Sequence, residues 1–116
     1  MIHEMACLEP WFSKILNEEK PVEGRKGKPE YRKIKAGDKI RFLDDDKSFI
    51  ALVTKVDEFD SVTDYLKGVG LENALPDPHV KTIEDGLKIY YQWSTSEQIE
   101  KLGFLGIWVQ PEKTTG

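Results

Sequence analysis

The chain has 116 residues, of which 39% are hydrophobic and 33% charged, and a formal net charge of -4. This length is typical of one domain that buries roughly two-thirds of its extended-chain surface, so we predict a single domain over residues 1–110 and a tail over 111–116. The apolar runs are too short to cross a bilayer and the N-terminus lacks a secretory pattern. We therefore expect a cytoplasmic monomer with no membrane partner.

The counts of cysteine and histidine exclude two further classes. Cys7 is the single cysteine, and the two histidines are His3 and His79. An intrachain disulfide needs two cysteines, and a zinc site of the usual type needs a Cys/His cluster. We therefore expect no disulfide, no metal and no cofactor.

The net charge hides an uneven distribution. Residues 20–41 hold nine Lys and Arg against three acids, a local charge of +6, whereas the rest holds eight basic and eighteen acidic residues, a charge of -10. A basic segment on an acidic protein can direct a polyanion to one face. It can equally be a solvated surface, because alternate residues of a strand point to opposite faces and scatter the charge.

The first part of the chain is predicted to contain a strand, a helix and a second strand. Residues 3–8 form the first strand, and Pro10 is expected in the first turn of the helix, where its missing N–H costs nothing. Helical spacing of the apolar residues in 11–16 gives this helix one face toward the core. The second strand, residues 20–26, contains proline and glycine, so it is expected to lie at a sheet edge or to carry a bulge.

The middle of the chain is predicted to form a hairpin. Residues 27–36 are polar and irregular, with at most one helical turn. Charged residues then alternate with Ile40 and Phe42, which predicts a half-buried strand over residues 39–43. After a hairpin loop, residues 48–56 are apolar on both faces, as is typical of a central strand.

The last part of the chain is predicted to contain two helices and a closing strand. Ser61 with Asp64, and Thr82 with Asp85, are capping signals that predict the starts of two helices. Residues 104–109 form the expected closing strand. The element order β-α-β-β-β-α-α-β predicts an α+β fold, a small mixed β-barrel with flanking helices.

A charged motif and a strand motif carry a resemblance to a known family. Lys20, Glu23 and Arg25 match the charged positions of a G-x-K-x-x-E-x-R pattern that follows a first helix, and the stretch GDKIRF matches a GD-x-I-x-F strand. The closing stretch LGFLGIWV looks like the last strand of the same family. The chain thus resembles the ASCH family, a branch of the PUA-like β-barrels, although Glu18 and Pro21 replace a glycine and a small residue of the pattern. The resemblance implies a domain that binds RNA or a nucleotide-derived ligand.

The three charged residues are the centre of the predicted site. Glu23 and Arg25 lie two apart on one strand, so they share a face and their side chains can meet. We predict that Arg25 holds a phosphate or a base edge, that Lys20 supplies a mobile positive charge, and that Glu23 orients both or accepts from a base amino group. Lys20 can join the other two if the strand bulges or breaks near residues 21–24. The alternative is an exposed strand edge with an ordinary ion pair.

Aromatic side chains are the second part of the predicted site, because nucleobases stack on aromatic rings. Tyr90 and Trp93 belong to the candidate set, but helical spacing places most aromatic residues in the core. We select Trp11, Tyr31 and Tyr91 as ligand-binding residues. Tyr31, in a polar loop among basic residues, is the one least expected in the core.

The resemblance also implies an alternative function. Some ASCH proteins are amidohydrolases that remove the acetyl group from acetylated cytidine with a lysine, a threonine and a glutamate. Lys20 matches the lysine, but Glu23 stands at the position of the threonine, where a carboxylate can at most activate water. Glu72 is a weak candidate for the glutamate. If the chain is an enzyme, Lys20 and Glu23 are its catalytic candidates, and the sequence leaves this alternative open.

Overall fold

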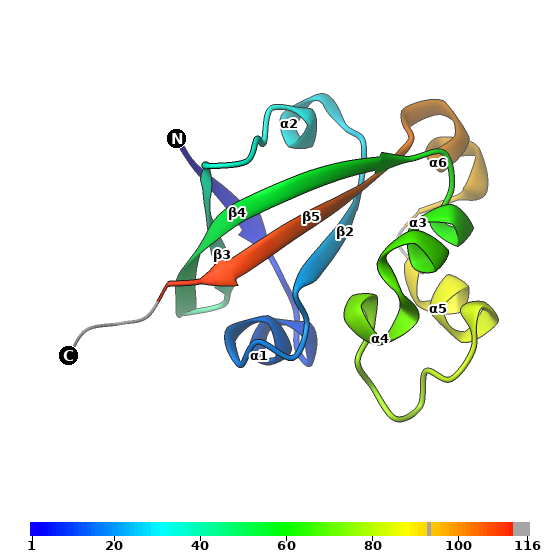
Figure 1. Ribbon diagram of the computed structural model, residues 1–116, viewed down its shortest axis with the longest axis horizontal. Helices are drawn as coiled ribbons and strands as arrows, with labels where there is room; N and C mark the ends of the chain where they lie inside the picture. Colours follow the sequence, from blue (N-terminus) through cyan, green and yellow to red (C-terminus); the bar gives the residue numbers. More distant parts are fainter. Residues whose placement is uncertain (93, 113–116) are drawn as a thin grey trace.

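The computed structural model describes residues 1–92 and 94–112. Within them, five strands form one curled sheet and six helices pack against it (Figure 1). The strands are β1 (Ile2–Ala6), β2 (Val22–Lys26), β3 (Lys39–Asp44), β4 (Lys47–Phe59) and β5 (Phe104–Pro111). The helices are α1 (Trp11–Leu16), α2 (Pro29–Arg32), α3 (Val62–Val69), α4 (Leu71–Ala74), α5 (Ile83–Tyr90) and α6 (Ser96–Leu102). No helix in these residues is long and apolar enough to cross a membrane.

The sheet has the strand order β1-β3-β4-β5-β2. β1 pairs with β3 in parallel, and the other three pairs are antiparallel. The long strand β4 pairs with β3 through its first half and with β5 through its second half. β2 lies at an edge, as the proline directly before it and the glycine within it predict. Its pairing with β5 is continuous from Val22 to Lys26, and the register shift of the sheet lies in β4 between Val53 and Lys55. Of the two alternatives that we predicted for this strand, an edge position or a bulge, the structure therefore shows the edge position.

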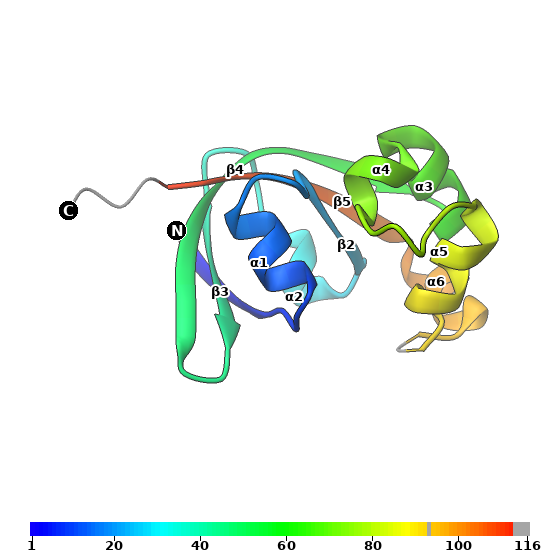
Figure 2. The ribbon, with the colours of Figure 1, turned by 90° about the horizontal axis from the view of Figure 1, so that it is seen from below.

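Two clusters of buried apolar side chains form the core. The first lies inside the curl of the sheet, where α1 and α2 fill the concave side (Figure 2). The second lies between the group α3–α6 and the end of the sheet formed by β2 and β5, and it includes Val22, Tyr65 and Phe104. Trp11 packs against both clusters. The two clusters therefore meet beside α1 and β2, where the charged motif lies.

Two glycines allow the second cluster to approach the sheet closely. A Cβ atom at Gly24 would lie 2.8 Å from Cζ of Tyr65, and one at Gly106 would lie 3.2 Å from Cε1 of the same ring. Contacts below 3.0 Å force a displacement. The absence of a side chain at Gly24 and Gly106 therefore lets α3 place Tyr65 directly against β2 and β5.

Several predicted elements differ in detail from the observed ones. Pro10 is the N-cap of α1 rather than a residue of its first turn. The expected helical turn in residues 27–36 is α2, and α4 and α6 were not predicted. β5 extends to Pro111, one residue into the predicted tail, of which residues 113–116 lie outside the described residues.

Candidate functional site

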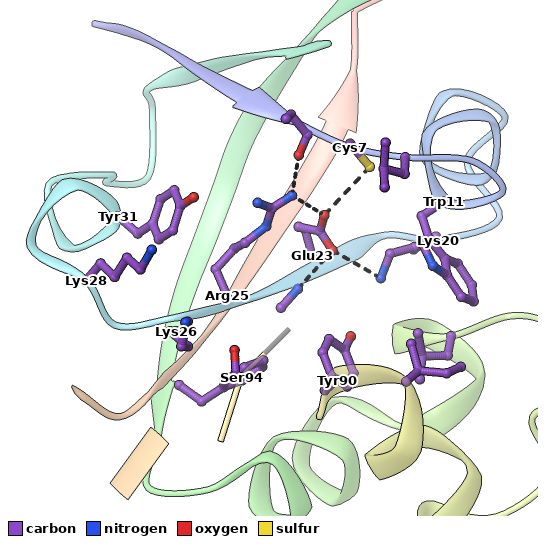
Figure 3. A pocket seen from close by; sticks show the side chains of 16 residues that line it. Cys7, Trp11, Lys20, Glu23, Arg25, Lys26, Lys28, Tyr31, Tyr90 and Ser94 are labelled. Carbon is purple, nitrogen blue, oxygen red and sulfur yellow. Dashed lines mark hydrogen bonds and ion pairs between the residues drawn. The ribbon is translucent and has the colours of Figure 1, made fainter. Parts of the chain in front are cut away.

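A cavity of about 350 Å³ lies where the two clusters meet (Figure 3). The end of β1, helix α1, strand β2 and the segment leading into α2 form one side, and the residue that follows α4, residues of α5 and the segment after α5 form the other. The lining residues are Ala6, Cys7, Leu8, Trp11, Lys20, Glu23, Gly24, Arg25, Lys26, Lys28, Tyr31, Leu75, Ile89, Tyr90, Ser94 and Phe104. The fold thus brings Lys20, Glu23, Arg25, Trp11 and Tyr31 of the predicted site into one cavity.

Lys20 lies just before β2 and its ammonium group has three acceptors. Nζ donates to the carbonyl oxygen of Val22 at 2.8 Å and to that of Ala74, and lies 3.5 Å from Oε1 of Glu23. Burial lowers the pKa of Lys20, whereas the negative Glu23 opposes this effect. Three acceptors match the three N–H groups of an ammonium ion. The side chain is therefore fixed in place and joins β2 to the end of α4, so the mobile charge that we predicted here is wrong.

Glu23 is the centre of the buried network. Its Oε2 accepts from Nη2 of Arg25 at 3.0 Å and from Sγ of Cys7 at 3.7 Å, and its Oε1 accepts from the backbone N–H of Gly24 at 3.1 Å. Burial alone raises the pKa of Glu23, but the positive charges of Arg25 and Lys20 and the hydrogen bonds from Arg25 and Gly24 outweigh it and lower the pKa. Both carboxylate oxygens are engaged, so Glu23 is an ionised counterion of the two basic groups.

Arg25 is the most accessible of the three charged residues. The side chains of Lys20, Glu23 and Arg25 are 1%, 9% and 22% exposed. Nη2 of Arg25 also donates to the carbonyl oxygen of Ala6 at 2.6 Å. Ala6 ends β1, and β1 and β2 are the two edges of the sheet, so Arg25 spans the gap between these edges. Among the described residues its hydrogen bonds use Nη2 alone, which leaves Nε and Nη1 as donors for a ligand.

The aromatic residues of the cavity surround this network. Nζ of Lys20 lies 5.7 Å from the ring centre of Trp11, and Cζ of Arg25 lies 5.8 Å from that of Tyr31. Tyr90 lines the cavity and its hydroxyl donates to that of Tyr65 at 3.5 Å. Burial raises the pKa of both phenols, so both stay neutral at physiological pH.

The structure does not bring Tyr91 together with the other predicted site residues. Tyr91 follows α5 as its C-cap, is 43% exposed and does not line the cavity. Consecutive residues of a helix point in directions about 100° apart. The orientation of α5 turns Ile89 and Tyr90 toward the cavity and leaves Tyr91 exposed. Trp93, the other aromatic candidate of this segment, lies outside the described residues.

The basic segment of the sequence is dispersed over the surface. Three of its residues form exposed ion pairs, Arg32 with Glu58, Lys39 with Glu112 and Arg41 with Glu4, and Lys33 and Lys35 are exposed. The cavity receives the other four of the nine basic residues, Lys20, Arg25, Lys26 and Lys28. With Glu23 as the acid among its lining residues, the cavity carries a formal charge of +3.

Other groups considered from the sequence contribute no reactive centre. Burial, followed by the negative Glu23, raises the pKa of Cys7 to about 12, so its thiol stays protonated at neutral pH. Glu72 is exposed on α4 and does not line the cavity. His3 bonds to Asp38 at 2.9 Å, and neither His3 nor His79 lines the cavity. No group of three or more metal-ligating side chains lies together in residues 1–92 and 94–112.

The fold and the charged cavity together define a small PUA-like domain. A family model described as "ASCH domain" matches residues 5–108, and the chain belongs to this family, which confirms the resemblance carried by the charged motif and the GD strand. The α+β fold that we predicted, a small mixed β-barrel with flanking helices, is confirmed in the form of a curled half-barrel.

Two solved structures are similar to this chain along its length. The crystal structure of hypothetical protein PH0355 is 33% identical, covers 97% of this chain and all of its own, and superposes with a TM-score of 0.89. The solution NMR structure of protein PF0455 from Pyrococcus furiosus is 32% identical, covers 98% of this chain and all of its own, and superposes with a TM-score of 0.79. A search of curated proteins finds no significant match.

Proposed function

We propose that the chain binds RNA or a nucleotide-derived ligand in the cavity. The observation that carries this proposal is the combination of a net positive lining with the aromatic side chains of Trp11, Tyr31 and Tyr90. Phosphates are attracted by positive charge, and nucleobases stack on aromatic rings. The cavity volume of about 350 Å³ lies within the range of small-molecule sites, which fits one nucleotide unit.

Arg25 is the residue we expect to contact the ligand most directly. Its Nε and Nη1 donors, in the plane of the guanidinium group, match two oxygens of a phosphate or two acceptors of a base edge. Lys20 and Glu23 hold Arg25 and the surrounding backbone in position. In this arrangement the ligand contacts Arg25, and the two other charged residues are positioning residues.

The proposal is tested by titrating the protein with short single-stranded RNA and with nucleotides. Arg25→Lys keeps the positive charge beside Glu23 but loses the planar fork, so we expect its affinity to fall about tenfold or more. Arg41→Lys, at an exposed ion pair with Glu4, is the control and is expected to bind as the unmodified protein does. Equal affinity of the Arg25→Lys variant would contradict the role of Arg25, and no binding of any RNA or nucleotide would reject the proposal.

The same purified protein also serves to distinguish the amidohydrolase alternative from simple binding. Lys20 is engaged by three acceptors and Glu23 by two basic groups, which is unfavourable for a nucleophile or a base that must exchange a proton. We therefore expect acetylated cytidine to remain intact when incubated with the protein. Turnover above background that is lost in Lys20→Ala would favour the enzyme instead.

A further inference from the structure

The two ends of the cavity differ in polarity. Trp11 lies at one end, Lys26, Lys28 and Tyr31 lie at the other, and Arg25 lies between them (Figure 3). Leu8 belongs to the Trp11 end, because its carbonyl oxygen accepts the backbone N–H of Trp11 at 3.0 Å. Leu75 belongs there too, because it follows Ala74, whose carbonyl oxygen binds Lys20 beside the Trp11 ring. One end is therefore apolar and aromatic, and the other is basic.

The ion pairs of the lysines increase this difference in polarity between the two ends of the cavity. At the Trp11 end the ammonium of Lys20 is balanced by Glu23 and its donors are occupied, so an anionic group would gain little there and would lose its hydration. At the other end, Lys26 donates to the neutral side chain of Gln98 at 3.3 Å. No carboxylate of the described residues forms an ion pair with Lys26 or Lys28. Of the formal charge of +3 in the cavity, two charges thus lie at this end without a paired carboxylate, and one remains in the network of Lys20, Glu23 and Arg25.

We propose that the ligand is a nucleoside monophosphate that lies in the cavity in one direction. Its uncharged base lies against Trp11 and Leu75, and its phosphate lies between Lys26 and Lys28. Arg25 donates to the ligand between these two positions. This inference rests on the proposed function and adds the orientation and the requirement for a phosphate at one end.

Calorimetric titrations of the folded protein test this orientation. The probes are the four nucleosides, their 5′-monophosphates and inorganic phosphate, with short RNA as a comparison. We expect at least one monophosphate to bind tenfold or more tightly than its nucleoside. The double variant Lys26→Ala/Lys28→Ala is expected to bind the monophosphate more weakly and the nucleoside as before, because the nucleoside does not contact the lysines. The ratio of the two affinities is therefore expected to fall below about threefold.

Two further variants distinguish the contributions that the two ends of the cavity make to binding. Trp11→Leu is expected to weaken nucleoside and monophosphate by the same factor, because it acts on the base alone. Lys33→Ala, an exposed lysine of the same segment that does not line the cavity, is the matched control and is expected to leave the ratio unchanged. A loss of the ratio in Lys33→Ala equal to that in the double variant would show a general charge effect and overturn the orientation.

The outcomes distinguish this inference from the proposed function. Equal affinity for nucleosides and monophosphates overturns the orientation and leaves the proposed function intact. Binding of RNA without binding of any monophosphate also overturns the orientation and leaves the proposed function intact, because the site would then require a ligand longer than one nucleotide. No binding of any probe, RNA included, overturns both.

Discussion

Lys20 connects two parts of the molecule through one ammonium group. Its acceptors belong to β2 and to the residue that ends α4. Removal of one partner from a buried ion pair leaves the other charge without compensation. Lys20→Met is therefore expected to lower the free energy of unfolding by about 3 kcal/mol, measured by urea denaturation. Lys33→Met, at an exposed position, is the control, and a loss in Lys20→Met no larger than that of the control would contradict this role.

The ionised state of Glu23 predicts a pH dependence of stability. The pKa of Glu23 in the folded protein lies below its usual value of 4.5, so its ionisation stabilises the folded state above about pH 4.5 and this contribution is lost as the pH falls through the lower folded pKa. Urea denaturation between pH 6 and pH 3 is expected to show a steeper loss in the unmodified protein than in Glu23→Gln. Other carboxylates with lowered pKa values, such as Asp38 and Asp85, are common to both proteins and cancel in the comparison. Parallel curves would contradict the prediction.

The residues of the network and the contact between Glu23 and Arg25 could be predicted from the sequence, but the partners from distant parts of the chain could not. The spacing of Glu23 and Arg25 on one strand predicts their contact, which is observed at 3.0 Å. Lys20 and Ala74 are 54 positions apart, and no local pattern indicates that a backbone carbonyl would meet the lysine. The choice of Tyr90 over Tyr91 depends on the rotation of α5 about its axis, which packing determines.

At the scale of elements, the contact between α3 and the sheet depends on two glycines of unequal importance. A Cβ at Gly24 would meet Cε2 of Phe104 at 2.7 Å as well as Tyr65, whereas one at Gly106 would meet its nearest neighbour at 3.2 Å. Gly24→Ala is therefore expected to destabilise the fold by about 1–3 kcal/mol, as overpacking does, and Gly106→Ala by less. Thermal denaturation of both variants measures the difference. A larger effect at Gly106 would show that the contact is not the cause.

The first residues of helices were predictable where the sequence contains a recognisable N-capping pattern. Thr82 and Asp85 form the capping box of α5 that their spacing predicts. α6 has the same signal in Thr95 and Gln98, which also form a capping box, so the start of this helix was predictable from the sequence as well. α4 has four residues and begins after Gly70, which adopts a φ of 92°. A helix of one turn carries too few residues to show a periodic pattern.

At the scale of the whole molecule, the distribution of charge predicts a weak dependence of binding on salt. In the proposed orientation, Lys26 and Lys28 are the two basic residues that meet the phosphate, whereas Arg32, Lys39 and Arg41 are already paired with carboxylates. With about 0.7 per neutralised phosphate on a single strand, the one phosphate between Lys26 and Lys28 predicts a slope near -0.7 for log K against log salt. Titrations of short RNA at several salt concentrations measure this slope. A slope of about -4 or steeper would require the basic residues that we have placed outside the site.

Phe59 and Phe104 face each other in register at the end of the β4–β5 pair. Residues 60–103 therefore leave the sheet and return to it at the same point, and the group α3–α6 is, in topological terms, one long excursion within a β-hairpin (Figure 1). A change in the length or sequence of this excursion leaves the register of every strand pair unaltered. It rebuilds the side of the cavity that holds Leu75 and Tyr90, while the basic side stays on the sheet and the segment after β2. In the proposed orientation, domains of this architecture can thus change the surroundings of the base while the lysines that meet the phosphate stay the same.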